Sequence, residues 1–455
     1  MKIEQQEFLD ELVSKVRNGR MTRRTFMERA IAVGIGSSAA LTLLEACGTP
    51  ANAGQSTTLT YWNLFGGGDG VRMIQMQGDF SKQFPDVDLQ AVTLAWGNPY
   101  YTKMAMAAAG GRPPDVAISH MTRMPTYAAQ GLLEPFDLNE LANVGVTEDK
   151  FLPLIWQRGQ YNGQLYAVPL DTHPFVAYYN TEIAKNAGLL DAHGNLKPIK
   201  GPDALMNALQ QAKQAAGSGG YGAVFEIQGV TPWRLFYTLY NQMGGQILSP
   251  DGKELVMDDS MAEEVLGFMT QLTTSKLAAQ NIDYAGSVAL FGSGKSCFLW
   301  NGEWEVTTFI TQKTPFNMVP FPLVYNEYHT QADSHSFVLP RQSVVDPARR
   351  AATLKFISFL LQDSLTWAEG GHVPAYLPVT ESSAYKQLKP QSNYASVAPN
   401  TVVDPTAWFS GSGSEMENQA GAAFQTALNG QATPAQGVSQ FRGAVEKLLA
   451  VKLPF

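Results

Sequence analysis

The sequence predicts an α/β protein built from two lobes, and three observations support this. Its 455 residues exceed the size at which one hydrophobic core keeps growing, so two domains are expected. Hydrophobic residues make up 45% of the chain and charged residues only 16%, which is typical of a protein with an extensive core. Short apolar runs alternate along most of the chain with segments of helical period, as in sheets whose strands are connected by helices.

The first α/β series begins with a strand predicted over residues 59–65, which ends in the glycine-rich loop 66–70. Apolar side chains then recur at spacings of three and four until Pro85, which predicts a helix. Alternating apolar residues over 87–91, a helix over 103–109 and a short apolar strand over 116–118 follow. This order predicts a mostly parallel sheet.

The second series follows a hairpin predicted at Asn162-Gly163, since this dipeptide favours a two-residue turn. The chain then runs extended through 166–170, and we expect it to cross to the second lobe directly afterwards. Strands and amphipathic helices continue to about Pro322. A further strand from Ser336, a helix over 349–361 and a largely helical C-terminal region complete the prediction.

The N-terminal residues 1–46 have the pattern of a signal peptide. Arg23 and Arg24 precede an uncharged run over 30–44, which is shorter and less apolar than a membrane-spanning helix. The arginine pair, followed by Thr-Phe-Met, is similar to a twin-arginine export signal. Leu-Glu-Ala before Cys47 is similar to a bacterial lipobox, although Glu45 replaces a usual small residue. We therefore expect Cys47 to be lipidated and residues 47–58 to form a tether.

Charge and cysteine content limit the partners and the stabilising bonds. The net charge is −8, so a nucleic-acid partner is not expected. The chain has two cysteines, and lipidation of Cys47 would leave Cys297 alone, so no intramolecular disulfide is predicted.

Common catalytic and nucleotide-binding motifs fail on spacing. The run Gly292-Ser-Gly-Lys-Ser lacks the earlier glycine of a phosphate-binding loop, because Ala289 stands there. The loop 66–70 has Val71 where a dinucleotide fingerprint needs glycine. Neither Gly-x-Ser-x-Gly nor His-Glu-x-x-His occurs, and the six histidines show no metal-ligand spacing. We predict no cofactor and no metal.

Tryptophans are candidate platforms for the apolar faces of sugar rings, because indole rings combine flat apolar surface with a polar N–H group. A pocket and a core position are equally expected for Trp62 and Trp304, and Trp233 is also a candidate for ligand binding. A core position is favoured for the other five, which are Trp96, Trp156, Trp300, Trp367 and Trp408.

Polar clusters next to predicted strand ends are further candidates. Asp171 and His173 stand at the predicted crossing, where they either contact ligand or brace the hinge. His120 follows a strand, where open α/β sheets bind ligands, and the same two roles are open to it. Arg123 and Arg234 are candidate anchors for a phosphate or carboxylate, although surface arginines are more common.

Together these segments resemble the family 1 extracellular solute-binding proteins of ABC importers, which include maltose-type and other sugar binders. The resemblance extends over nearly the whole chain, and it depends on the order and spacing of motifs that are each weak alone. The motifs lie at 61–70, 80–87, 103–116, 131–135, 162–171 with 179–180, 291–304, 352–361 and 371–375.

The resemblance implies the two-lobed periplasmic-binding-protein fold (type II), with several crossing segments and a ligand cleft between the lobes. It places lobe 1 at 59–170 plus 337–370 and lobe 2 at 171–336 plus 371–455. The ligand contacts it implies, taken with the tryptophan candidates above, are Trp62, Asp69, His120, Asp171, His173, Trp233, Asn301, Gly302, Trp304 and Tyr376.

The resemblance implies a monomeric, exported lipoprotein that binds a mono-, di- or oligosaccharide by lobe closure and delivers it to the transmembrane subunits of an ABC importer. It would lie on the outer face of the cytoplasmic membrane, and no catalysis is expected. Three alternatives stay open: the same fold binding a glycerol phosphodiester or another small anion, an exported carbohydrate-active enzyme, and a role in signalling.

Overall fold

A computed structural model describes residues 56–451, so Arg23, Arg24 and Cys47 lie outside the described residues. The first of its two larger sheets has the strand order β2-β1-β3-β13-β4, with β7 paired to β13. β1 and β3 are parallel, with Tyr61 opposite Val116, and β13 is antiparallel to β3, with Phe337 opposite Ile118. The strand bounds are β1 (Thr57–Asn63), β2 (Val87–Thr93), β3 (Val116–His120), β4 (Leu133–Glu134), β7 (Ala167–Pro169) and β13 (His335–Pro340).

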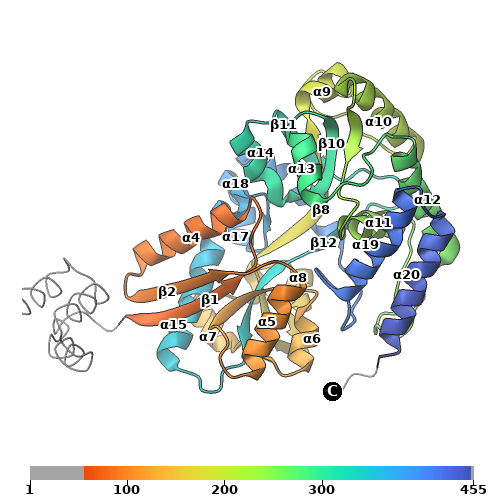
Figure 1. Ribbon diagram of the computed structural model, residues 1–455. Helices are drawn as coiled ribbons and strands as arrows, with labels where there is room; N and C mark the ends of the chain where they lie inside the picture. The colour runs from red at the N-terminus through yellow and green to blue at the C-terminus, as the bar shows by residue number, and fades with distance from the viewer. Residues whose placement is uncertain (1–55, 452–455) are drawn as a thin grey trace, which may run out of the picture. The chain divides into compact units, whose positions relative to one another are not determined.

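Helices surround this sheet and enclose a core with it (Figure 1). Met73, Met76 and Phe80 on α4 are buried, as their helical spacing predicts. Phe80 packs edge-on against Phe356 of α15, which joins the start and the end of this half in one core. The helix bounds are α4 (Gly70–Gln83), α5 (Asn98–Ala109), α6 (Met124–Ala129), α7 (Leu138–Asn143), α8 (Pro153–Arg158), α15 (Pro347–Gln362) and α16 (Ser364–Glu369).

The second sheet is built around β8 (Asp171–Asn180), whose ten residues are all buried. Its order is β15-β12-β8-β10-β9, with β11 and β14 also paired to β8. Successive side chains of β8 point to opposite faces, so Phe175 and Tyr179 enter one core while Val176 and Tyr178 enter another. The other bounds are β9 (Tyr221–Val224), β10 (Ser296–Gly302), β11 (Phe316–Pro320), β12 (Thr330–Asp333), β14 (Val373–Pro374) and β15 (Thr401–Val402).

Helices cover both faces of the second sheet, and the C-terminal pair α19 and α20 packs against α11 and α12, as Figure 1 shows. The predicted helical C-terminal region is confirmed. The bounds are α9 (Thr181–Asn186), α10 (Pro202–Ala216), α11 (Thr231–Gln242), α12 (Asp259–Thr274), α13 (Tyr284–Gly292), α14 (Val306–Gln312), α17 (Leu377–Thr380), α18 (Ser383–Gln387), α19 (Glu415–Leu428) and α20 (Pro434–Leu449).

The predicted hairpin is present, but the mostly parallel sheet predicted for the first series is found only in part, because β13 is antiparallel to β3, β4 and β7. Asn162 and Gly163 both have positive φ (49° and 76°) between β5 (Gln160–Tyr161) and β6 (Gln164–Leu165). In the second sheet, β8 is likewise antiparallel to β10, β11, β12 and β14. Both β8 and β13 enter from the other sheet and run against their neighbours, and strand-helix alternation in the sequence gives no sign of such strands.

The chain changes sheet at three places. It passes from β7 to β8 at Leu170, from β12 to β13 at Ser334, and from α16 to β14 over 370–372. Ser334 lies two residues before the predicted boundary at 336/337. Beyond the third passage, Tyr376 packs in the core of the first half, where Phe151 contacts it edge-on. The segment directly after residue 371 therefore contributes to both halves.

Candidate functional site

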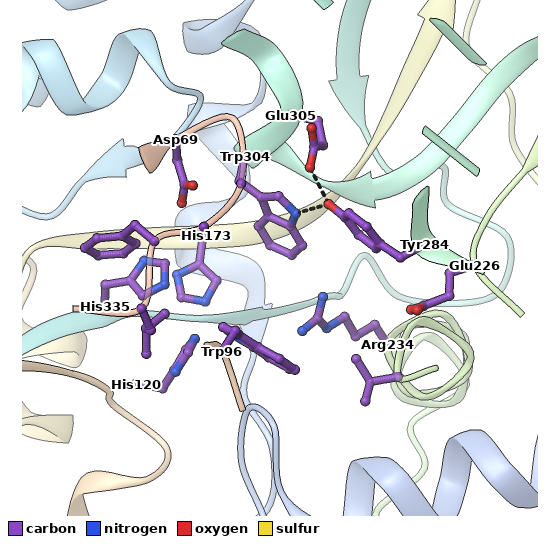
Figure 2. A pocket seen from close by; sticks show the side chains of 15 residues that line it. Asp69, Trp96, His120, His173, Glu226, Arg234, Tyr284, Trp304, Glu305 and His335 are labelled. Atoms are coloured by element: carbon purple, nitrogen blue, oxygen red, sulfur yellow. Dashed lines mark hydrogen bonds between the residues drawn. The ribbon is translucent and has the colours of Figure 1, made fainter. Parts of the chain in front are cut away.

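A cavity of about 440 Å³ is lined by residues that come from both sheets (Figure 2). Its volume lies within the range of small-molecule sites. From the first half come the loop after β1, Trp96 after β2, and the sheet ends at His120 and His335. The second half contributes the start of β8, the region of α11, the first residue of α13 and the turn after β10. The lining residues are Leu64, Phe65, Gly66, Gly67, Asp69, Trp96, His120, His173, Glu226, Val230, Arg234, Tyr284, Trp304, Glu305 and His335.

The glycine-rich loop after β1 brings the backbone of both halves together beside the cavity. A Cβ atom on Gly68 would lie 2.7 Å from Oγ1 of Thr308 in α14, so the absence of a side chain permits this approach. Gly66 and Gly67 line the cavity directly. Part of the close contact of this loop is therefore with the other half of the protein.

Trp304 is held in one orientation by a chain of hydrogen bonds that Figure 2 shows in part. Its Nε1 donates to the Tyr284 hydroxyl at 2.6 Å, and Tyr284 donates to Glu305 at 2.6 Å. Asn301 also donates to the Tyr284 hydroxyl, at 3.2 Å. A Cβ atom on Gly302 would lie 1.8–2.3 Å from atoms of the indole, so glycine is required there. Four neighbouring groups thus position one aromatic ring at the cavity.

A second indole, Trp96, lines the same cavity and is 39% exposed. The Arg234 guanidinium lies 5.7 Å from the ring centre of Trp96 and 5.0 Å from that of Trp304, within the range of cation–π contacts. Figure 2 shows the arginine pointing from α11 toward both rings. The cavity therefore combines two flat aromatic surfaces with a planar cation.

The carboxylate of Asp171 connects all three passages between the sheets. It accepts hydrogen bonds from Nδ1 of His173 (3.0 Å), from the backbone N–H and Nδ1 of His335 (both 2.8 Å), and from Nε1 of Trp367 (2.7 Å). Nδ1 of His372 lies 3.3 Å from the same carboxylate. Because β8, β13 and the segment before β14 all meet here, this group of residues forms the hinge cluster of Asp171, His173, His335 and His372.

The charges in the hinge cluster follow from burial and from its carboxylates. Burial alone would lower the pKa of His372, but Asp171, Glu303 and Asp69 outweigh it and raise the pKa to about 10, so this imidazole is charged at neutral pH. Burial, assisted by the neighbouring His335, lowers the pKa of His173 to about 3. Burial raises the pKa of Asp171, but His335 and His372 outweigh it and hold that pKa well below its usual range. An ionised Asp171 thus lies beside the charged ring of His372 and the neutral ring of His173.

Hydrogen bonds fix the tautomers of two imidazoles at the cavity. Asp171 is ionised and can only accept, so His173 donates through Nδ1 and its neutral ring presents an Nε2 lone pair. The Tyr101 hydroxyl accepts from the backbone N–H of His120 and donates its own proton to Nδ1 of the ring, 2.6 Å away, so this nitrogen is the acceptor. His120 consequently presents an Nε2–H donor. A donor and an acceptor side by side suit the hydroxyl groups of a sugar.

The ligand atoms of the hinge cluster lie within 4.8 Å of one another, which is close enough for a metal ion to be considered. In this structure, however, the lone pairs of Asp171 already accept four hydrogen bonds. A metal ion would have to displace these donors, so the arrangement fits a hydrogen-bonded hinge better. The spacing of histidines in the sequence gave no sign of this cluster, because each comes from a different passage.

Of the residues expected to contact ligand, four line the cavity: Asp69, His120, His173 and Trp304. Three others do not line the cavity but contact residues that do. Asp171 is fully buried beneath it, and Asn301 and Gly302 hold or admit the side chains of Tyr284 and Trp304.

Three expected contacts lie elsewhere and correct the prediction. Trp62 lines a separate surface depression beside α5, where Lys103 lies 5.2 Å from its ring centre. Trp233 is fully buried and donates to Asp404 at 3.0 Å. Tyr376 is buried in the core of the first half. Trp62 lies within β1, before the loop that lines the cavity, and its ring lies beside α5 instead.

Other lining residues were missed or misjudged from the sequence. Trp96 was assigned to the core, although its place between β2 and the helix that begins at Asn98 could have marked it as a residue of a strand-end loop. Glu226, Tyr284, Glu305 and His335 were not singled out, and no motif marks them. Arg234 lines the cavity, whereas Arg123 lies over the ring of Tyr101, 4.4 Å from its centre. The core positions expected for Trp156, Trp300 and Trp367 are confirmed.

Two α/β halves joined by three passages, with a cavity at the strand ends between them, define a two-lobed solute-binding protein. The chain belongs to the bacterial extracellular solute-binding protein family, whose model matches residues 44–364. The two-lobed fold expected from the sequence is thereby confirmed, and the family is one of binding proteins. Among the residues that the structure describes, no helix is both long and apolar enough to cross a membrane.

Relatives and solved structures agree with this assignment. The chain is 24% identical over 389 residues to a maltooligosaccharide ABC transporter solute-binding lipoprotein of Streptococcus pneumoniae, which covers 80% of this chain and 84% of that protein. An arabinooligosaccharide-binding protein of Bacillus subtilis is 26% identical over 243 residues, about half of each chain. The GacH receptor of Streptomyces glaucescens, solved unliganded and with acarbose, superposes with a TM-score of 0.74 at 18% identity over 87% of this chain and 98% of that one.

Proposed function

We propose that this protein is the extracytoplasmic substrate-binding component of an ABC importer and that its ligand is a saccharide. The observation that carries the proposal is the cavity itself, where two indoles stand beside paired hydrogen-bonding groups at the meeting point of both halves. Indole faces match the apolar faces of sugar rings, and the imidazoles of His120 and His173 match their hydroxyls. The sugar-binding relatives support this ligand class.

Binding proceeds by a shift between open and closed arrangements of the halves. Ligand that contacts Trp96 on one half and Trp304 on the other binds the closed arrangement better, so it shifts the population toward closure. The hinge cluster is the pivot, because its central carboxylate bonds to all the passages that must bend together. The transmembrane subunits of the importer recognise the closed monomer and receive the ligand.

Export and attachment follow from the N-terminal segment. Arg23 and Arg24 direct a folded protein across the cytoplasmic membrane, and lipid on Cys47 holds it at the outer face. A related solute-binding protein is named a lipoprotein, which supports this part of the proposal. Metabolic labelling with a palmitate analogue tests the lipid attachment. We expect the wild-type chain to take up label and a Cys47→Ala variant to take up none. Equal labelling of the wild type and the variant would refute attachment at Cys47.

Thermal unfolding against a ligand panel tests the proposed function. A chain that begins at residue 48 keeps the whole compact unit that starts at Thr58. We expect its unfolding midpoint to rise with the concentration of one class of saccharide and not with amino acids, because a ligand that binds only the native state stabilises it. A rise with glycerol phosphodiesters alone would preserve the fold and contradict the sugar assignment. Turnover of a glycoside would contradict a binding-only role.

A further inference from the structure

Arg234 is the one charged side chain lining the cavity that makes no side-chain hydrogen bond among the described residues. It lies in α11, is only 7% exposed and lines the cavity. Its guanidinium carries five N–H donors and stays charged in proteins, yet it makes no hydrogen bond to any residue in the described range 56–451. Although the residue is largely buried, its guanidinium nitrogens are open to the cavity, where they can donate to a ligand.

The nearest carboxylate accepts no hydrogen bond from Arg234. Oε1 of Glu417 lies 3.9 Å from Nε of Arg234, beyond hydrogen-bonding distance. Burial raises the pKa of Glu417, and the attraction of Arg234 only partly offsets this, so the neutral acid is favoured. Asp404 is a second buried carboxylate near this cation: burial raises its pKa to about 6, and Arg234 partly offsets that rise. Asp404 and Glu417 accept hydrogen bonds from Trp233 and from the backbone N–H of Gly413, and neither accepts one from the guanidinium.

The carboxylates that line the cavity are already engaged by other donors. Glu226 accepts from the backbone N–H and hydroxyl of Thr231, at 3.1 and 2.7 Å, at the start of α11. Glu305 accepts from Tyr284 and from Thr308 (2.7 Å). Asp69 lies 3.3 Å from Nε2 of His372. Each acid has a partner in the protein, and only the cation between the two indoles has none.

The position of Arg234 also fixes the shape of the missing partner. The guanidinium lies 5.7 Å from the ring centre of Trp96 and 5.0 Å from that of Trp304, and these contacts restrict its orientation. Its planar N–H groups are thereby positioned to donate two parallel hydrogen bonds to one ligand group. A carboxylate matches that geometry. The acids lining the cavity would repel a phosphate dianion more strongly than a carboxylate monoanion, so the carboxylate is favoured.

We infer that the saccharide bound by this protein carries a carboxylate, as a uronic acid does, and that Arg234 receives it in a bidentate pair while the sugar ring lies against the indoles. This inference rests on the proposed sugar-binding function and adds the charge of the ligand. It makes Arg234 the residue that distinguishes acidic from neutral saccharides.

Calorimetric titration with matched ligand pairs tests the inference. Uronic-acid disaccharides are compared with neutral disaccharides of the same linkage, and sugar phosphates are included. For the wild type we expect the acidic member to bind about 10- to 100-fold more tightly, and raised salt to weaken only that binding. R234Q should remove the preference, R234K should keep part of it, and the matched control R442Q, whose side chain contacts Asp259 outside the cavity, should keep all of it.

The outcomes separate this inference from the proposed function. Equal affinity for acidic and neutral saccharides in the wild type would overturn the inference and leave sugar binding intact. This comparison uses the wild type alone, so it does not depend on the folding of a variant. Tighter binding of sugar phosphates than of uronates would overturn the carboxylate assignment. Failure of every saccharide to bind would contradict the proposed function itself.

Discussion

Replacing Asp171 by asparagine removes one charge from the centre of the hinge cluster and keeps the shape of the side chain. The native carboxylate is fully buried and accepts four hydrogen bonds of 2.7–3.0 Å. Asparagine offers one oxygen instead of two, and its NH₂ group faces donors. The substitution also leaves the charged ring of His372 without one of its buried counter-ions, 3.3 Å away.

The magnitude follows from the partners that remain. Removing one member of a buried ion pair costs about 3–5 kcal/mol of stability. Oε1 of Glu303 still lies 2.9 Å from Nδ1 of His372, and Asp69 lies 3.3 Å from its Nε2, so part of the compensation survives. We therefore expect Asp171→Asn to lower the free energy of unfolding by about 3 kcal/mol, at the lower end of that range.

Urea unfolding measures the effect, with Asp346→Asn as the matched control. Asp346 is an exposed N-cap of α15, where asparagine serves equally well, so we expect a change below about 0.5 kcal/mol. A double variant sharpens the test: His372→Gln should cost less stability in the Asp171→Asn background than alone, because the two residues interact. If Asp171→Asn and Asp346→Asn differ by less than about 1 kcal/mol, or if the costs at 171 and 372 simply add, the reasoning about the hinge cluster is refuted.

Three further predictions concern the cavity and its histidines. Gly302→Ala should weaken saccharide binding at least tenfold, because the added Cβ displaces the Trp304 ring. The control Gly78→Ala, on an open helix face, should leave binding unchanged. Equal affinities of the two variants would contradict the role of Gly302. In calorimetric titration, Trp96→Ala should lower saccharide affinity at least tenfold, whereas Trp408→Ala, outside the cavity, should not. Unchanged affinity in Trp96→Ala would show that Trp96 does not contact the ligand. The pKa of His173 is about 3 when folded and near 6.5 when unfolded, so the unfolded state binds more protons between these values and stability falls as pH falls. From pH 7 to 5 the wild type should lose about 2 kcal/mol more than His173→Gln in urea unfolding, and equal losses would show that this imidazole is not buried as a neutral ring.

Much of the fold could be predicted because burial imposes a period on the sequence. The buried residues Met73, Met76 and Phe80 have the helical spacing of α4, and Asn162-Gly163 specifies its hairpin by backbone conformation alone. Strand orientation in the second sheet could not be predicted in the same way. It depends on the direction in which β8 enters from the other half, and no local pattern records that direction.

The candidate site was only partly predictable for a related reason. His120 was predicted because it follows a strand, Trp304 because indole faces suit sugar rings, and Asp69 only through the family resemblance; all three line the cavity. Trp96 was assigned to the core because most tryptophans are buried, but it is 39% exposed and lies in a loop that follows a strand. Asp171 and His173 were predicted at the crossing, but His335 and His372 were not, because they become neighbours of Asp171 only when three passages, far apart in the chain, converge.

The central claim is that a saccharide binds between the two halves against Trp304. Calorimetric titration of the wild type and of Trp304→Ala with the saccharide that most raises the unfolding midpoint tests it most directly. We predict one binding site per chain in the wild type and an affinity at least tenfold lower in the variant, with both proteins equally folded before titration. Unchanged affinity in the variant, or no binding heat from any saccharide in the wild type, would contradict the claim.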